Sequence, residues 1–155
     1  MEERRQYSAC AVANEFLRLA KLEHTTLTNM QVQKLVFLAN GYCLALTGSP
    51  LYYHNTQAWQ WGPVIPQLYK ALQKYGNGSV TEDLAAPDDI APDDADALAI
   101  IRGAWSGYGN RSAFELSSLT HKPGSPWRQT WEKDQFGIIP TDTIAAYYRN
   151  LLGEA

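Results

Sequence analysis

The sequence contains little cysteine, no long apolar run and no cluster of basic residues. Its two cysteines, Cys10 and Cys43, stand among apolar neighbours and form no Cys-x-x-Cys pair. We therefore expect two buried thiols in a reducing cytoplasm, not a disulfide framework or a thiolate metal site. The longest apolar stretch runs only from Leu35 to Leu46, whereas a helix needs roughly 20 apolar residues to cross a bilayer. Together with an N-terminus that lacks the apolar core of a signal peptide, this predicts a cytoplasmic protein without membrane contact.

Established catalytic and cofactor motifs are missing from the sequence. It has no phosphate-binding loop, dinucleotide fingerprint, His-Glu-x-x-His pair or Cys/His zinc spacing. The three histidines, His24, His54 and His121, all fall in predicted loops. We therefore expect no cofactor, no metal and no enzymatic activity.

The charge distribution argues against nucleic acid as a partner. Asp and Glu number 16 against 13 Lys and Arg, which gives a net charge of −3, and the basic residues are scattered. Extensive binding to nucleic acid requires many phosphates to be neutralised. Acidic residues gather between Thr81 and Asp96, but their spacing does not match a calcium loop. We expect this segment to be a solvated connector whose acids favour the N-terminus of the next helix.

Apolar residues recur at helical spacing along most of the chain. With 155 residues, 45% of them apolar, the chain is long enough for one domain with a sizeable core. We place that single domain at 1–155 and its core at about 7–152. The expected fold is mainly α: a compact bundle of six or seven helices around a central apolar helix at about 28–47, with one short β element near 51–61.

The central helix is predicted by its caps and by its composition. Thr28 and Gln31 form a capping box at its start, and Gly48 ends it. The helix between them is apolar on nearly all sides, as is typical of a helix surrounded by others. Lys34 interrupts it and has two interpretations. Its aliphatic stem can lie along apolar surface with the ammonium in water, or its charge can point into a partner site.

The segment from Gln57 to Val64 is the most distinctive part of the sequence. It contains Trp59 and Trp61 at a spacing that places both rings on one side of an extended chain. Gly62-Pro63 follows and is expected to end the strand and fix a corner. The segment carries no nucleophile, carboxylate or metal ligand, so it is suited to packing or binding. Tryptophans are favoured both in cores and at interfaces, and the sequence leaves these two interpretations open.

His121 lies in a second distinctive loop. The loop is expected between a helix that ends at Leu119 and a helix that begins at Ser125-Pro126-Trp127. A catalytic base at His121, as in a hydrolase, is one interpretation. The interpretation we favour is that its ring caps the preceding helix and fixes the turn.

These segments, taken in order, resemble a known family. The sequence is similar to the Panacea-type antitoxin domain, the SocA/GepA-like family associated with phages and mobile elements. The residues that carry the resemblance are Val12-Ala13-Asn14, the segment from Leu27 to Ala39, the segment from Ala58 to Pro66 with Leu68-Tyr69, Leu116 to His121, and Ser125-Pro126-Trp127. The resemblance extends from about Tyr7 to Leu152.

The resemblance implies a mostly helical antitoxin that neutralises a cognate protein toxin by direct binding, with the toxin encoded next to it. The alternatives are a proteolytic adaptor that delivers the toxin to a host protease, and a phage-encoded modulator of a host protein. The oligomeric state and the identity of the toxin stay open. The partner-binding residues we expect are Lys34, Trp59, Trp61, Gly62, Pro63, Tyr69, His121 and Trp127.

Overall fold

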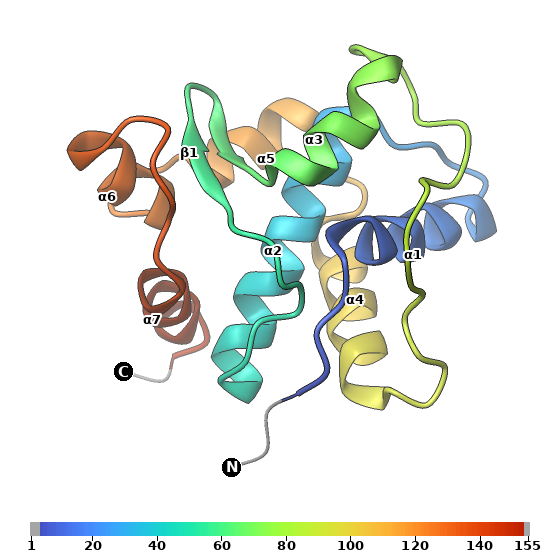
Figure 1. The fold of residues 1–155 in the computed structure, drawn as a ribbon, viewed down its shortest axis with the longest axis horizontal. Coiled ribbons are helices and arrows are strands. Elements are labelled where there is room, and N and C mark those ends of the chain that lie inside the picture. Colours follow the sequence, from blue (N-terminus) through green and yellow to red (C-terminus); the bar gives the residue numbers. More distant parts are fainter. Residues whose placement is uncertain (1–3, 154–155) are drawn as a thin grey trace.

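The computed structural model describes residues 4–153, and within them the chain is mainly α-helical, as predicted (Figure 1). Seven α-helices and one two-stranded antiparallel sheet form in this part of the chain. Their bounds are α1 Ala9–Leu22, α2 Asn29–Thr47, β1 Gln57–Trp59, β2 Gly62–Val64, α3 Pro66–Leu72, the 3₁₀ turn η1 Gln73–Tyr75, α4 Ala95–Tyr108, α5 Ala113–Thr120, α6 Pro126–Lys133 and α7 Thr141–Leu151.

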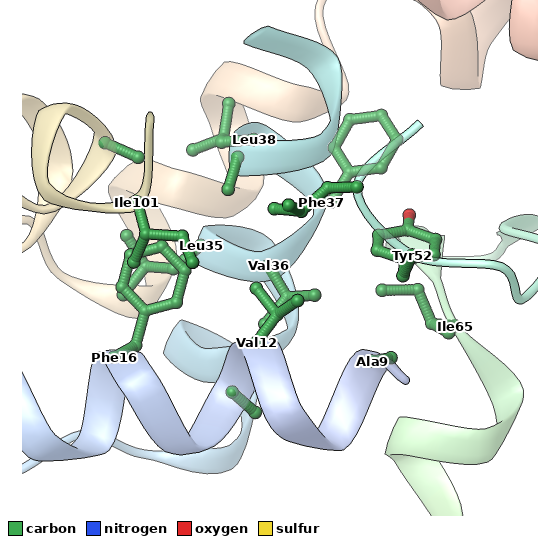
Figure 2. Close-up of a cluster of buried hydrophobic side chains, with 14 of the residues drawn as sticks. Ala9, Val12, Phe16, Leu35, Val36, Phe37, Leu38, Tyr52, Ile65 and Ile101 are labelled. Atoms are coloured by element: carbon green, nitrogen blue, oxygen red, sulfur yellow. The ribbon is translucent and has the colours of Figure 1, made fainter. Parts of the chain in front are cut away.

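Helix α2 is the centre of the fold. It contacts α1, α3, α4, α5, α7 and β2, and these elements surround it in Figure 1. Figure 2 shows Val12 and Phe16 of α1 meeting Leu35 and Val36 of α2, with Ile101 of α4 beside them. All five side chains are fully buried. The central apolar helix predicted at about 28–47 is therefore confirmed.

The ends of α2 follow from local hydrogen bonds. The Thr28 hydroxyl accepts from the Gln31 backbone N–H, and the Gln31 side chain accepts from the Thr28 N–H. This capping box satisfies two donors that a helix start leaves without partners. At the other end Gly48 adopts a left-handed conformation with φ +80°, which glycine reaches without steric cost.

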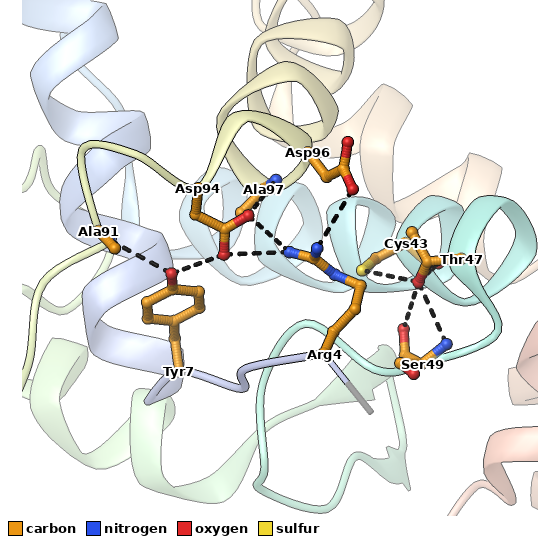
Figure 3. A network of polar contacts seen from close by, with 9 residues as sticks. All are labelled: Arg4, Tyr7, Cys43, Thr47, Ser49, Ala91, Asp94, Asp96 and Ala97. Atoms are coloured by element: carbon orange, nitrogen blue, oxygen red, sulfur yellow. Dashed lines mark hydrogen bonds and ion pairs between the residues drawn. The ribbon is translucent and has the colours of Figure 1, made fainter. Parts of the chain in front are cut away.

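The acidic connector is tied to the N-terminal segment and is not simply solvated, which corrects part of our expectation. Asp88 accepts hydrogen bonds from the backbone N–H and the hydroxyl of Ser8. Asp94 caps α4 and pairs with Arg4, with 2.8 Å between Nη2 and Oδ1 (Figure 3). Burial acts to raise the pKa of Asp94, but hydrogen bonds from Arg4 and Tyr7 outweigh it and lower the pKa below the ordinary value.

The β element is a hairpin, and Pro63 lies inside its second strand. The pairs are Gln57 with Val64, Ala58 with Pro63 and Trp59 with Gly62. The expectation that Gly62-Pro63 ends the strand is therefore wrong. Pro63 is tolerated because its partner Ala58 directs its own N–H and C=O to the other side, where they bond Gly137 and Phe136.

The sequence also predicts that no helix crosses a membrane and that the chain forms one domain. Among residues 4–153, no helix has the length and apolar character needed to cross a bilayer. The buried apolar side chains form one cluster that reaches from Tyr7 to Tyr148 and includes Cys10 and Cys43. The domain limits of 1–155 with a core at 7–152 stay a prediction, and residues 1–3 and 154–155 lie outside the described part.

Candidate partner-binding groove

A groove of about 610 Å³ opens beside the start of α2. Its walls are the first turns of α2, the β1–β2 hairpin, and α3 with η1, and Phe136 and Ala113 complete it. This volume lies within the range of typical ligand pockets. Among the described residues that line it, Lys34 is the only charged one.

Four exposed apolar side chains gather at this groove. Trp61 is 64% exposed, Phe136 54%, Met30 39% and Tyr69 36%, and all four line the groove. A continuous exposed apolar patch on a folded protein marks an interaction site more often than a scattered apolar residue does. The rigid rings of Trp and Tyr are also the preferred anchors of protein interfaces.

Two of these side chains, Tyr69 and Phe136, belong to a continuous row of aromatic rings. Trp59 contacts Tyr69, with 4.9 Å between ring centroids, and Phe136 at 6.4 Å. The row continues through Trp131 to Trp127, which stacks on Trp131 at 5.5 Å, and ends with the ring of His121 edge-on to Trp127 at 4.3 Å. The Trp127 indole N–H donates to the Trp59 carbonyl. The row therefore joins the loop around His121 to the hairpin, two regions that the sequence analysis singled out separately.

Lys34 is buried beneath the hairpin. Its side chain is 2% exposed, and Nζ donates to the Pro63 carbonyl at 3.0 Å. The interpretation with the ammonium in water is therefore wrong. Burial lowers the pKa of Lys34 from 10.5 to about 7, because removing water disfavours the charged form.

Gly62 permits this close approach. Its φ of +124° is a conformation that other residues rarely adopt, and a β-carbon at position 62 would lie 2.7 Å from Nζ of Lys34. The hairpin turn Gln60-Trp61 precedes it, and the Ser117 hydroxyl donates to the Trp61 carbonyl at 3.1 Å. Because Trp61 lies in the turn, the two tryptophans do not share an extended segment, but both line the groove.

Two other polar residues of α2 bond the backbone of the segment that follows this helix, and one of them holds the residue between β2 and α3. The Gln33 side chain accepts from the Ile65 N–H at 3.1 Å and donates to the Ile65 carbonyl at 3.3 Å. Asn40 accepts from the Leu51 N–H at 2.8 Å. Both residues are buried. The sequence analysis assigned a role to neither residue. A polar residue in an otherwise apolar helix does indicate such contacts, because buried polar groups need hydrogen-bond partners.

His121 occupies the C-cap position of α5, as predicted, but its ring packs against Trp127. Within residues 4–153 the ring bonds none of the helix carbonyls, so its capping role is confined to the backbone. Burial and the nearby positive charges of Lys34 and Arg128 lower the pKa of His121 below its ordinary value. His121 is therefore largely neutral at pH 7.

The structure brings the eight expected residues into one region in two layers. Lys34, Trp59, Trp61 and Tyr69 line the groove. The other four do not line it: Gly62 and Pro63 of the hairpin contact Lys34, and Trp127, on which His121 packs, bonds the hairpin. Sequence analysis missed Met30 and Phe136. Phe136 has a left-handed backbone conformation, with φ +66°, and its N–H donates to the Ala58 carbonyl. No local pattern in the sequence predicts that contact.

Comparison with known proteins identifies the family. The family model described as "Antitoxin SocA-like, Panacea domain" matches residues 32–128, a range that includes all eight expected residues. The chain belongs to this family of SocA-like proteins with a Panacea domain. It is 32% identical over 127 residues to Antitoxin SocA of Caulobacter vibrioides (strain NA1000 / CB15N), which covers 77% of this chain and 68% of that protein. No solved structure matches the chain.

Proposed function

We propose that this protein is an antitoxin that neutralises a cognate protein toxin by binding it directly through the groove. Membership of the SocA-like family supports the antitoxin role. The observation that carries the direct binding is the gathering of Trp61, Phe136, Met30 and Tyr69 around the groove. Burying such side chains against a partner removes apolar surface from water, and the rigid rings lose little conformational entropy.

The aromatic row gives the surface its rigidity. Trp127 is buried and bonds the Trp59 carbonyl, so the hairpin that carries Trp61 is supported from behind. Pre-organised side chains bind with a smaller entropic cost than mobile ones. We therefore expect the toxin to contact the exposed residues that line the groove, and the buried residues behind them, such as Trp127, to stabilise the fold.

The test is binding of the toxin encoded beside this gene, measured by calorimetry. Trp61→Ala and Phe136→Ala are expected to weaken binding at least tenfold while leaving the fold intact. Leu22→Ala is the matched control, because Leu22 is 63% exposed at the end of α1 and does not line the groove. Unchanged affinity in both groove variants places the interface elsewhere, and failure of the wild-type protein to bind the toxin refutes direct neutralisation.

The adaptor role is a second candidate, because a second groove of about 440 Å³ lies between α2 and α4. Tyr42, Leu46 and Tyr108 are among its lining residues. An adaptor requires one surface for the toxin and another for the protease. Toxin half-life in cells distinguishes the two roles, because an adaptor shortens it and a blocker leaves it unchanged or longer.

The proposed mechanism is non-enzymatic. A hydrolase centred on His121 would lose activity when the imidazole is removed. We expect His121→Ala protein that folds to rescue cells from the toxin as the wild-type protein does. Loss of rescue with unchanged toxin affinity would instead support a catalytic role.

A further inference from the structure

Lys34 has the features of one half of a buried ion pair. Its ammonium has three N–H donors, and the Pro63 carbonyl accepts from it at 3.0 Å. Within residues 4–153 it forms no ion pair, and burial alone accounts for its lowered pKa. A buried cation without a counter-charge is costly, since neither water nor a carboxylate compensates it.

In the described part of the chain, no carboxylate acts on Lys34. The charges of Lys34 and of Arg128 in α6 both act on the imidazole of His121, at the end of α5. The described residues that line the groove are apolar or uncharged apart from Lys34. Lys34 is therefore the single cation among the described lining residues, and it lies beneath apolar walls.

The rim of the groove suits a peptide main chain. Asn29, Gln60, Gln73 and Asn77 line it and carry amide groups that can both donate and accept hydrogen bonds. Trp59 and Tyr69 supply flat apolar walls between this rim and Lys34. Because Lys34 is 2% exposed and bonded to Pro63, a side chain that enters between these walls must displace part of the hairpin to reach Nζ.

We propose that the groove binds a segment of the toxin in which an aspartate or glutamate, flanked by apolar residues, inserts its carboxylate onto Nζ of Lys34. This inference rests on the proposed function, because it names the chemistry by which the same groove recognises the toxin. Charge complementarity selects the occupant: a carboxylate supplies the counter-charge that Lys34 lacks, and the apolar neighbours match the walls.

The test is a double-mutant cycle between this protein and the toxin encoded beside it. Lys34→Met removes the charge and keeps the stem, and Lys70→Met is the matched control at an exposed position of α3. Each acidic residue of the toxin is changed to its amide. We expect one toxin substitution and Lys34→Met each to weaken binding at least tenfold, with no further loss when they are combined. Circular dichroism and thermal unfolding establish that each variant is folded.

A second measurement does not depend on the variants. Because Lys34 is about half deprotonated near pH 7, pairing with a carboxylate draws a proton onto it. Calorimetry in two buffers of different ionisation enthalpy is expected to show uptake of up to about half a proton per complex at that pH, and none with Lys34→Met.

The outcomes separate the two proposals. If the toxin binds and Trp61→Ala weakens it, while Lys34→Met and every toxin amide variant bind as the wild type does without proton uptake, the carboxylate inference is overturned and the proposed function stands. If the losses in binding from Lys34→Met and from the toxin substitution add when the two are combined, the two residues do not interact and the inference is also overturned. If the wild-type protein does not bind the toxin, the proposed function itself fails.

Discussion

Nζ of Lys34 lies against the α-carbon of Gly62, so close that a β-carbon at position 62 would lie 2.7 Å from it. The same ammonium donates to the carbonyl of Pro63. One buried lysine thus joins the central helix to the strand that carries the Trp-Gly-Pro motif. This contact explains the glycine of the motif, because a β-carbon at position 62 would meet the ammonium, whereas the carbonyl that accepts at position 63 is one that any residue supplies.

Gly62→Ala is therefore expected to destabilise the protein by about 1–3 kcal/mol, because it adds backbone strain and displaces Lys34. Gly124→Ala is the control, since Gly124 also has a positive φ, +83°, but no atom lies within 4 Å of the place that its β-carbon would take. Urea unfolding measures both variants. An equal loss in the two would show that backbone strain alone acts at position 62 and that the contact with Lys34 has no cost.

The stability of the wild-type protein should depend on the Lys34 ammonium above neutral pH. The folded protein binds this proton with a pKa of about 7, and the unfolded chain with one near 10.5. Between these values the unfolded state binds more protons, so this group makes stability rise with pH, by up to about 1.4 kcal/mol per pH unit. Below about pH 7 Lys34 is protonated in both the folded and the unfolded state, and the full free-energy cost of burying its charge remains.

Comparison with Lys34→Met isolates this effect. Burial raises the pKa of Cys10, Cys43 and Tyr148, which makes stability fall over the same pH range, but these contributions are common to both proteins. The variant is expected to be more stable than the wild type near pH 7, with the difference shrinking toward pH 10. A difference that does not change with pH would mean that Lys34 keeps its ordinary pKa in the folded protein.

What the sequence could and could not predict follows from the range of the interactions. The cap at Thr28 depends on a residue three positions away and forms as predicted, and a second capping box of the same spacing forms at Ser112. The burial of Lys34 depends on a hairpin 29 residues further along the chain. The position of Phe136 depends on its bond to Ala58. Such long-range contacts produce no periodic pattern in the sequence. Single residues of the groove could therefore be predicted, but the groove that they form together could not.

Gln33→Leu is expected to destabilise the protein by about 1–3 kcal/mol. Leucine fits an apolar helix, but it leaves the N–H of Ile65 buried without its partner, whereas the Ile65 carbonyl keeps the bond that it accepts from the Tyr69 N–H. Gln73→Leu, at an exposed position on the other wall of the groove, is the control and should change stability little. Hydrogen exchange of the Ile65 amide provides a local measurement, with faster exchange expected in Gln33→Leu. Unaltered exchange would assign the Ile65 N–H to another acceptor.

Gly41→Ala tests the packing of α7 on the central helix. A β-carbon at position 41 would lie 2.5 Å from the ring of Tyr148, which is buried against α2. Alanine favours the helix by about 1 kcal/mol over glycine, but the displaced ring must outweigh that gain, so a net loss of about 1–3 kcal/mol is expected. Gly103→Ala in α4, where nothing lies within 4 Å, should instead gain up to about 1 kcal/mol. Thermal unfolding that shows Gly41→Ala gaining stability as Gly103→Ala does would mean that α7 does not pack this closely on α2.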